Sequence, residues 1–267
     1  MQVVAADVGN SSIKLMRATL DPQTGTTRPD WPDIRSLAPR SLAESSLGPL
    51  FDPAGSAAPC HWYVSSVNQT HAERLRELAE HHDLVQSWKP VHCGQIDLVI
   101  EVESPAATGI DRLLAAEAAK KMHAADSDLI VIDCGTAMTI DLVTRDNVFR
   151  GGVILAGPET NLQALAAMTS ALPDLSGQPL GRPESPVGRS TQEALMAGAW
   201  LNGLGAIRET VARYSELLEG SPVVVGTGGG LGPWRDDLPD TWIVVDNLVL
   251  EGLFRIAHGL IAESRSS

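Results

Sequence analysis

Residues 3–14 read Val3-Val4-Ala5-Ala6-Asp7-Val8-Gly9-Asn10-Ser11-Ser12-Ile13-Lys14. A short apolar run, a Gly-Asn turn signal and a second apolar run predict strand, tight turn, strand. We expect Gly9 to adopt a positive φ, which brings backbone amides into a concave anion site. Asp7 at the rim suits magnesium held through water, and Lys14 suits a phosphate. An ordinary hairpin turn explains the same residues, so this stretch alone leaves phosphate binding open.

The second half of the chain repeats this pattern. Val131-Ile132-Asp133-Cys134-Gly135-Thr136 again ends an apolar run in Asp-x-Gly and a small polar residue. A third element, Gly226-Thr227-Gly228-Gly229-Gly230, follows the apolar run Val223–Val225, and backbone without side chains approaches a flat adenosine closely. Two Asp-Gly turns that clamp a polyphosphate from both sides, with a glycine-rich loop behind, resemble the arrangement of actin-like ATPases and kinases.

Predicted strands and helices alternate along the chain, which is typical of the α/β class. We expect two actin-like (ribonuclease H-like) domains with a cleft between them, residues 1–118 and 119–267. The last helix, 248–261, is able to pack back on the first domain. Capping-box spacing at Thr70–Glu73 and at Ser190–Glu193 predicts two helix starts. Further helices are predicted over 111–125 and 162–172, and loops with short strands over 21–59.

Composition excludes several classes of function. A net charge of −13 disfavours nucleic acid as a partner. No apolar run approaches the length of a membrane span, and the first residues do not resemble a signal peptide. The three cysteines are far apart, which favours reduced thiols in a cytoplasm over disulfides or zinc. The chain contains neither a Walker-type phosphate loop nor a dinucleotide-binding Gly-x-Gly-x-x-Gly motif.

Asp111, in Thr108-Gly109-Ile110-Asp111-Arg112, is the candidate base. A kinase that phosphorylates a hydroxyl needs a carboxylate that orients it and accepts its proton. Gly109 would allow close approach of substrate, and Arg112 pairs readily with a carboxylate. An Asp in the first turn of a helix is also favoured by the helix dipole, so this motif alone leaves both interpretations open. His71, His81, His82 and His92 are interpreted as surface or helix residues.

Taken together, these motifs resemble the type III pantothenate kinase family over nearly the whole chain. Asp7–Lys14 and Asp133–Ala137 are similar to the family's two phosphate motifs, and Gly109–Arg112 to its Gly-x-Asp-Arg signature. Gly151–Ile154, Gly188–Thr191 and Leu248–Leu253 are similar to a following hairpin, a substrate-contacting segment and the closing helix.

The resemblance implies ATP-dependent phosphorylation of pantothenate to 4′-phosphopantothenate, the first step towards coenzyme A, by a cytoplasmic homodimer. It implies Asp111 as the proton acceptor, and Asp133 as the ligand of a monovalent cation, K⁺ or NH₄⁺, besides Mg²⁺. The implied ATP contacts are Asp7, Val8, Gly9, Asn10, Ser11, Ser12, Ile13, Lys14 and Thr136. The implied substrate contacts are Val102, Gly109, Ile110, Asp111, Arg112 and Thr191.

The sequence departs from the family pattern in two places. Val102 stands where relatives usually have tyrosine, and Leu155-Ala156-Gly157-Pro158 stands where they usually read Ala-Pro-Gly. Neither change removes a catalytic group, but both bear on substrate affinity. Two alternatives therefore stay open: a non-catalytic accessory relative, and a kinase of the same fold that acts on another hydroxy acid.

Overall fold

The structure is a computed structural model that describes residues 1–21, 27–29, 34–42, 47 and 59–266. Contacts divide the chain into two compact units. Unit 1 comprises 1–97, 104–118 and 248–267, and unit 2 comprises 98–103 and 119–247. The last helix therefore belongs to the first unit, and a short segment before residue 104 belongs to the second.

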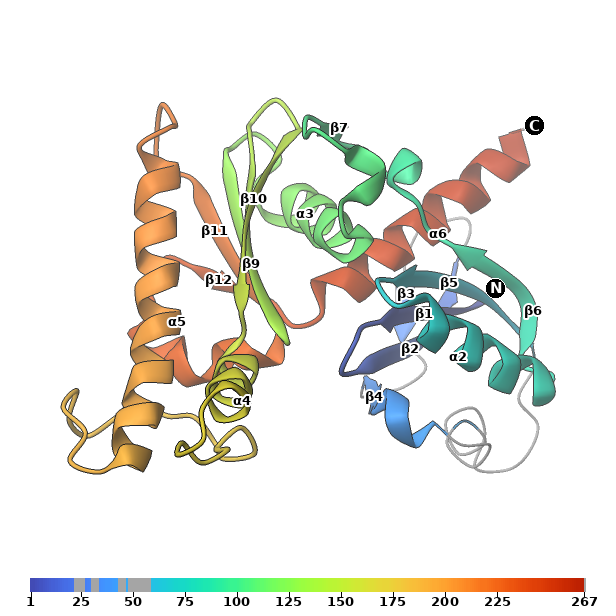
Figure 1. Cartoon of the computed structure of the whole chain (residues 1–267). Helices are drawn as coiled ribbons and strands as arrows, with labels where there is room; N and C mark the ends of the chain where they lie inside the picture. The colour runs from blue at the N-terminus through green and yellow to red at the C-terminus, as the bar shows by residue number, and fades with distance from the viewer. Residues whose placement is uncertain (22–26, 30–33, 43–46, 48–58, 267) are drawn as a thin grey trace. The chain divides into compact units, whose positions relative to one another are not determined.

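One mixed sheet forms the middle of unit 1. Its strands run in the order β3-β2-β1-β5-β6, and β4 pairs with β2 (Figure 1). The strand bounds are β1 Gln2–Val8, β2 Ile13–Leu20, β3 Thr27–Pro29, β4 Arg35–Leu37, β5 Cys60–Ser66 and β6 Val85–Pro90. β1 is antiparallel to β2 and parallel to β5, which is parallel to β6. The strand-turn-strand predicted at the start of the chain is confirmed.

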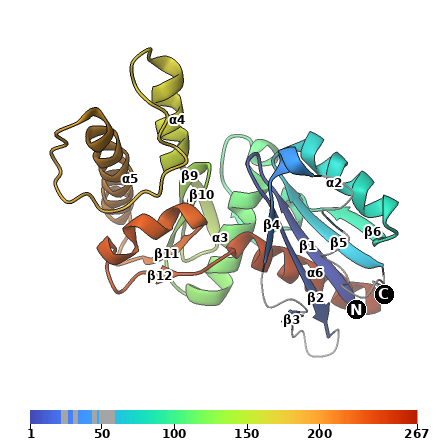
Figure 2. The same cartoon turned by 90° about the horizontal axis from the view of Figure 1, so that it is seen from below.

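Helices cover both faces of this sheet (Figure 2). α2 (Gln69–His81) buries Ala72, Leu75, Leu78 and Ala79 in one apolar core with residues of β1, β2 and β5. α6 (Leu248–Ser266) packs against β1, β2 and β5. Gly252 allows α6 to approach the start of α3 (Ile110–His123), because a Cβ there would lie 2.7 Å from the Leu114 carbonyl oxygen.

The predicted cap of α2 is wrong by two residues. The N-cap is Asn68, whose Oδ1 accepts from the backbone N–H of His71 at 3.1 Å, so Thr70 lies inside the helix. Asparagine is as good a cap as serine or threonine. The Thr-x-x-Glu spacing wrongly favoured Thr70 over Asn68.

Unit 2 repeats the strand plan of unit 1. Its sheet order is β12-β11-β8-β9-β10-β7, where β8 is antiparallel to β9 and parallel to β11, as β1 is to β2 and β5. The strand bounds are β7 Val99–Ile100, β8 Leu129–Cys134, β9 Ala137–Val143, β10 Val148–Ala156, β11 Val223–Thr227 and β12 Ile243–Val244. The repeated Asp-x-Gly pattern in the sequence thus corresponds to a repeated sheet topology.

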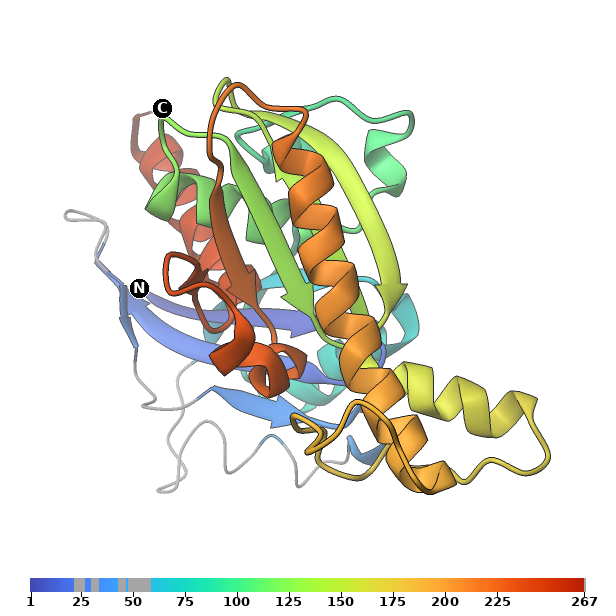
Figure 3. The same ribbon diagram turned by 90° about the vertical axis from the view of Figure 1, so that its left-hand side faces the viewer.

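Two helices of unit 2 follow β10. α4 (Pro158–Met168) begins earlier than predicted, because Pro158 occupies its first turn and suits that position. α5 (Thr191–Ser215) lies across the sheet and contacts β8 and β9 (Figure 3). Its predicted cap is confirmed: Ser190 Oγ accepts from the Glu193 N–H at 3.2 Å.

Short 3-10 helices link these elements: η1 Pro39–Ser41, η2 Cys93–Gln95, η3 Pro105–Ala107 and η4 Gly229–Asp237. Among the helices that the structure describes, none is long and apolar enough to cross a membrane. Much of the region 21–59, predicted as loops and short strands, lies outside the described residues. Its described part contains β3, β4 and η1.

Candidate active site

The first phosphate motif forms a tight turn between β1 and β2. The Gly9 N–H donates to the Ser12 carbonyl oxygen at 3.0 Å, and Asn10 and Ser11 are exposed. Asp7 lies opposite Lys14 in the strand register. The positive φ expected at Gly9 is wrong, because in the described residues the positive-φ glycines are Gly151 and Gly228. Glycine eases the close approach instead: a Cβ would lie 3.0 Å from the Ser12 oxygen, a tight contact.

Two side chains at the start of α2 hold this turn, and the sequence did not identify either as functional. Asn68 Nδ2 donates to Asn10 Oδ1 at 3.0 Å, and His71 Nδ1 lies 3.1 Å from the Gly9 carbonyl oxygen. His71 was interpreted as a surface or helix residue. The available signal was an asparagine two residues after the end of a strand, which favours a helix cap close to the strand ends.

Asp111 occupies the first turn of α3, and its side chain folds back on the backbone. Its Oδ1 accepts from the Arg112 N–H at 2.8 Å. Burial raises the pKa of Asp111 above its usual value, and the Arg112 amide and guanidinium offset part of that rise. A Cβ on Gly109 would lie 2.5 Å from Asp111 Oδ1, so this glycine makes room for the catalytic candidate's own carboxylate. A raised pKa is what a proton acceptor working near neutral pH requires.

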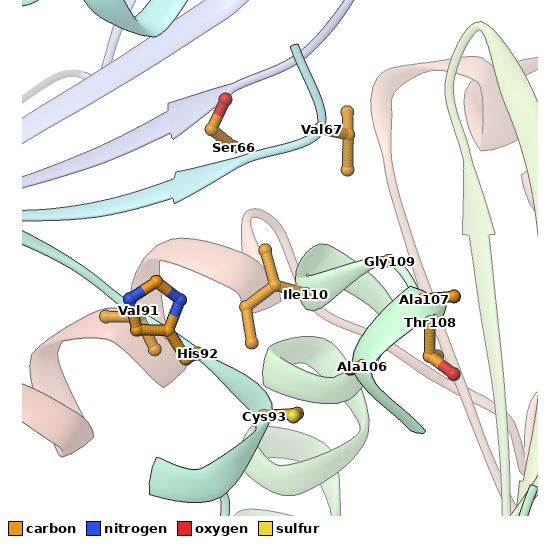
Figure 4. A pocket seen from close by; sticks show the side chains of 10 residues that line it. All are labelled: Ser66, Val67, Val91, His92, Cys93, Ala106, Ala107, Thr108, Gly109 and Ile110. Atoms are coloured by element: carbon orange, nitrogen blue, oxygen red, sulfur yellow. The ribbon is translucent and has the colours of Figure 1, made fainter. Parts of the chain in front are cut away.

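A cavity of about 460 Å³ in unit 1 lies beside this helix start (Figure 4). It opens at the carboxyl ends of the parallel strands β5 and β6, the edge where α/β sheets usually bind ligands. Its walls are polar and apolar in about equal measure. The lining residues are Ser66, Val67, Val91, His92, Cys93, Ala106, Ala107, Thr108, Gly109 and Ile110. Gly109 and Ile110 of the predicted substrate set thus line a real cavity.

The second phosphate motif forms the equivalent turn of unit 2. It connects β8 to β9, the Gly135 N–H donates to the Ala137 carbonyl oxygen at 2.9 Å, and Thr136 is exposed. The loop at Leu155–Pro158, which differs from the family pattern, packs against this turn. The Thr136 carbonyl oxygen accepts from the Gly157 N–H at 2.9 Å and from Thr160 Oγ1 at 2.7 Å. Glycine is required at 157, because a Cβ would lie 2.0 Å from the Gly135 carbonyl oxygen.

The glycine-rich loop after β11 packs against the end of β8. Gly228 has φ 89°, and a Cβ there would lie 2.3 Å from the Cys134 carbonyl oxygen and 2.6 Å from Asp133 Oδ1. Contacts within the protein therefore account for Gly228 without a nucleotide. A smaller cavity of about 100 Å³ adjoins the loop, and its lining residues are Gly228, Gly229, Leu231, Gly232, Arg235, Val244 and Asp246.

The Asp133 surroundings offer oxygen atoms to a cation. Asp133 Oδ1 and the Cys134 carbonyl oxygen lie on the same side of Gly228, and hard cations prefer oxygen ligands. Burial, and next the charge of Asp133, raise the pKa of the Cys134 thiol to about 12, which disfavours a soft thiolate ligand. Within the described ranges, no group of three or more His, Cys, Asp or Glu side chains forms a metal cluster. This pair of oxygen atoms is not the set of sulfur and nitrogen ligands that zinc prefers.

The remaining predicted substrate residues belong to unit 2. Val102 follows β7, and its Cγ1 would lie 3.2 Å from a Cβ on Gly151. Thr191 is the exposed first residue of α5, next to the Ser190 cap. Gly109–Arg112 belong to unit 1, so the predicted substrate set is divided between the two units.

Comparisons with known proteins add to this geometry. Residues 3–213 match the family described as type III pantothenate kinase. A type III pantothenate kinase of Rhodopirellula baltica is 36% identical over 254 residues, which cover 88% of this chain and 90% of the relative.

Solved structures are similar in fold. A Sinorhizobium meliloti protein described as a 2-dehydro-3-deoxygalactonokinase has TM-score 0.55 at 11% identity, covering 97% of this chain and 96% of its own. The ethanolamine utilization protein EutJ of Carboxydothermus hydrogenoformans has TM-score 0.53 at 12% identity, covering 97% and 89%. At such identities the likeness shows the fold alone, and the predicted actin-like α/β class is confirmed.

Proposed function

The chain belongs to the type III pantothenate kinase family, and from this membership we infer that it transfers a phosphoryl group from ATP to pantothenate. The product, 4′-phosphopantothenate, is the first intermediate on the way to coenzyme A. The single observation that carries the assignment to this chain's own chemistry is the Gly109–Arg112 segment. It places a half-buried carboxylate of raised pKa beside a cavity.

Asp111 is the proposed proton acceptor. Its carboxylate would orient the acceptor hydroxyl and take its proton, while the oxygen forms a bond to the γ-phosphorus and the bond to the β-phosphate oxygen breaks. The acceptor hydroxyl of pantothenate sits beside a carbon that carries two methyl groups. The apolar side chains of Val67, Val91 and Ile110 in the cavity suit that end of the molecule.

The two Asp-Gly turns are the proposed phosphate sites. The exposed residues Asn10 and Ser11 in unit 1, and Thr136 in unit 2, would bind the phosphates of ATP. Units 1 and 2 would then be the two actin-like domains that the sequence predicted.

Recognition of the rest of pantothenate is assigned to three side chains. Arg112 would pair with the carboxylate of pantothenate, and Val102 and Thr191 would contact its chain. The homodimer and the cytoplasmic location predicted from the sequence stay predictions.

Two cations are part of the proposal. Asp133 would hold K⁺ or NH₄⁺, and Asp7 would bind Mg²⁺ through water, since both present carboxylate oxygen. When bound, Mg²⁺ neutralises charge on the phosphates of ATP.

A coupled ADP-release assay tests the function. We expect ADP release that depends on pantothenate and falls when sodium replaces potassium. A panel of other hydroxy acids at equal concentration should give less release. Release from ATP alone at the same rate would contradict the assignment.

Asp111→Asn tests the assigned base in the same assay. Loss of a general base lowers kcat by about a hundredfold or more. Glu159→Gln is the matched control, because Glu159 is an exposed carboxylate in the first turn of α4. A folded Asp111→Asn protein with wild-type turnover would remove Asp111 from the mechanism.

A further inference from the structure

Asn68 links the end of β5, the start of α2 and the first phosphate turn through its own atoms. Its backbone N–H donates to Ser66 Oγ at 3.1 Å, and its carbonyl oxygen accepts from the Ala72 N–H at 3.1 Å. Its side chain makes the cap with Oδ1 and reaches Asn10 Oδ1 with Nδ2. Both ends of one amide are therefore used, one for the helix and one for the turn.

The contact of His71 fixes the direction of a peptide group. The Gly9 carbonyl oxygen faces His71 Nδ1 at 3.1 Å. The described chain contains no cis peptide bond, and in a planar trans peptide the C=O and the next N–H point in opposite directions. The Asn10 N–H therefore points away from α2.

The same contact sets the tautomer of His71. A carbonyl oxygen only accepts hydrogen bonds, so the hydrogen must be on Nδ1. Neutral imidazole in this tautomer and imidazolium both carry that hydrogen. The contact thus does not depend on the charge of His71.

We propose that Asn68 and His71 are positioning residues that hold the 9–12 turn in the geometry that binds the phosphates of ATP. The proposal rests on the function proposed above, because it takes this turn as a phosphate site. Asn10 and Ser11 are exposed at its tip, and ordering an exposed turn on binding opposes affinity. Two anchors from a packed helix order the turn beforehand. The effect falls on nucleotide affinity and not on binding of the acceptor.

The competing interpretation is that Asn68 serves the helix cap alone. Asn68→Ser keeps a capping oxygen and loses the donor to Asn10 without adding charge. Asn68→Ala loses both. We expect Asn68→Ser to keep a Tm near that of the wild type and to raise the KM for ATP, whereas Asn68→Ala lowers Tm as well.

His71 allows a rescue experiment. His71→Leu removes the donor, and His71→Asn restores one because its Nδ2 lies where histidine has Nδ1. His81→Leu, the same change near the other end of α2, is the control. Loss of one hydrogen bond predicts a rise of about threefold to tenfold in both the KM and the Kd for ATP in His71→Leu. His71→Asn should return both near wild type, with the KM for pantothenate unchanged throughout.

ATP Kd, measured calorimetrically without acceptor, separates the two proposals. Wild-type Kd in both His71→Leu and Asn68→Ser would overturn the positioning role, as would equal losses for both substrates that follow Tm. A wild type that binds ATP but does not phosphorylate pantothenate would overturn the proposed function only. A wild type that binds no ATP would overturn both.

Discussion

At the scale of single residues, the ionisation of Asp111 sets the pH dependence of the reaction. Burial raises its pKa, and a base must be ionised to accept a proton. Below that pKa the carboxyl is protonated and inactive, so kcat/KM should fall as pH falls through it. An ordinary aspartate has a pKa of about 3.9, so we expect the acid limb of the pH profile to lie above that value.

The pH profile of kcat/KM checks this, because it reports ionisations of the free enzyme. The limb should disappear from the residual activity of Asp111→Asn and stay in Glu159→Gln. An acid limb that survives in Asp111→Asn would assign the ionisation to another group.

Residue roles could be predicted from the sequence where one motif carries them and not where two segments meet. Asp111 and Gly109 were identified from adjacent letters, although the carboxylate that Gly109 accommodates belongs to Asp111 itself. Asn68 and His71 touch residues about sixty positions earlier, at Gly9 and Asn10. No local pattern reveals such a contact, so their part in the site needed the fold.

At the scale of elements, the segment from β6 into η2 carries a cysteine whose chemical modification reports on the cavity of unit 1. Cys93 lines it, whereas Cys60 and Cys134 are fully buried. Thiol reagents need an accessible thiolate, so iodoacetamide should modify Cys93 first. Pantothenate should slow this reaction if it occupies the cavity.

Intact-protein mass spectrometry follows the modification, with Cys93→Ser as the control that should show almost none. ATP alone is the comparison ligand, because its proposed contacts lie in the phosphate turns. Equal rates with and without pantothenate, at saturating concentration, would place the substrate outside this cavity.

Elements were predicted best where periodicity and boundary signals agree. The apolar runs around Val4 and Val131 correctly predicted the first hairpin of each sheet, and the Ser190 cap correctly predicted the start of α5. The glycine-rich loop was located correctly, but Gly228 is explained by its contact with the end of β8. A sequence identifies where side chains are absent and does not say which neighbour needs the space.

At the scale of the whole molecule, unit 1 is completed by the last segment of the chain. α6 buries Leu248, Leu250, Leu253 and Phe254, and it contacts β1, β2 and β5. Burial of one such side chain contributes about 1.5–3 kcal/mol. Four together rival the total stability of a domain, about 5–15 kcal/mol.

Fragments should therefore differ in stability. Residues 1–118 alone lack α6 and should show no cooperative thermal transition. Residues 119–247 lose the segment 98–103 with the edge strand β7 and the part of α3 before residue 119, but they keep the other strands of their sheet and should fold. Fusing residues 248–267 to the first fragment should restore a transition. Circular dichroism during heating measures all three, and a cooperative transition of 1–118 alone would contradict the role given to α6.

The division of the chain into units 1 and 2 could be predicted only in part from the sequence. Repetition of the Asp-x-Gly pattern indicates two similar halves. Val99 and Ile100 pair with Val148 and Phe149 on β10, and nothing in their local sequence indicates that partner. Pairings across such separations are decided by packing, which a one-dimensional pattern does not contain.

The late position of α6 has a consequence during translation. The ribosome makes the strands of unit 1 first, yet their covering helix α6 is synthesised only after unit 2. Unit 2, encoded later, is complete before that moment, which reverses the usual amino-to-carboxyl order of domain folding. Until α6 is made, the sheet of unit 1 has one apolar face exposed. A chaperone could bind that face. A premature stop codon before residue 248 would thus leave an open N-terminal half beside a finished second unit.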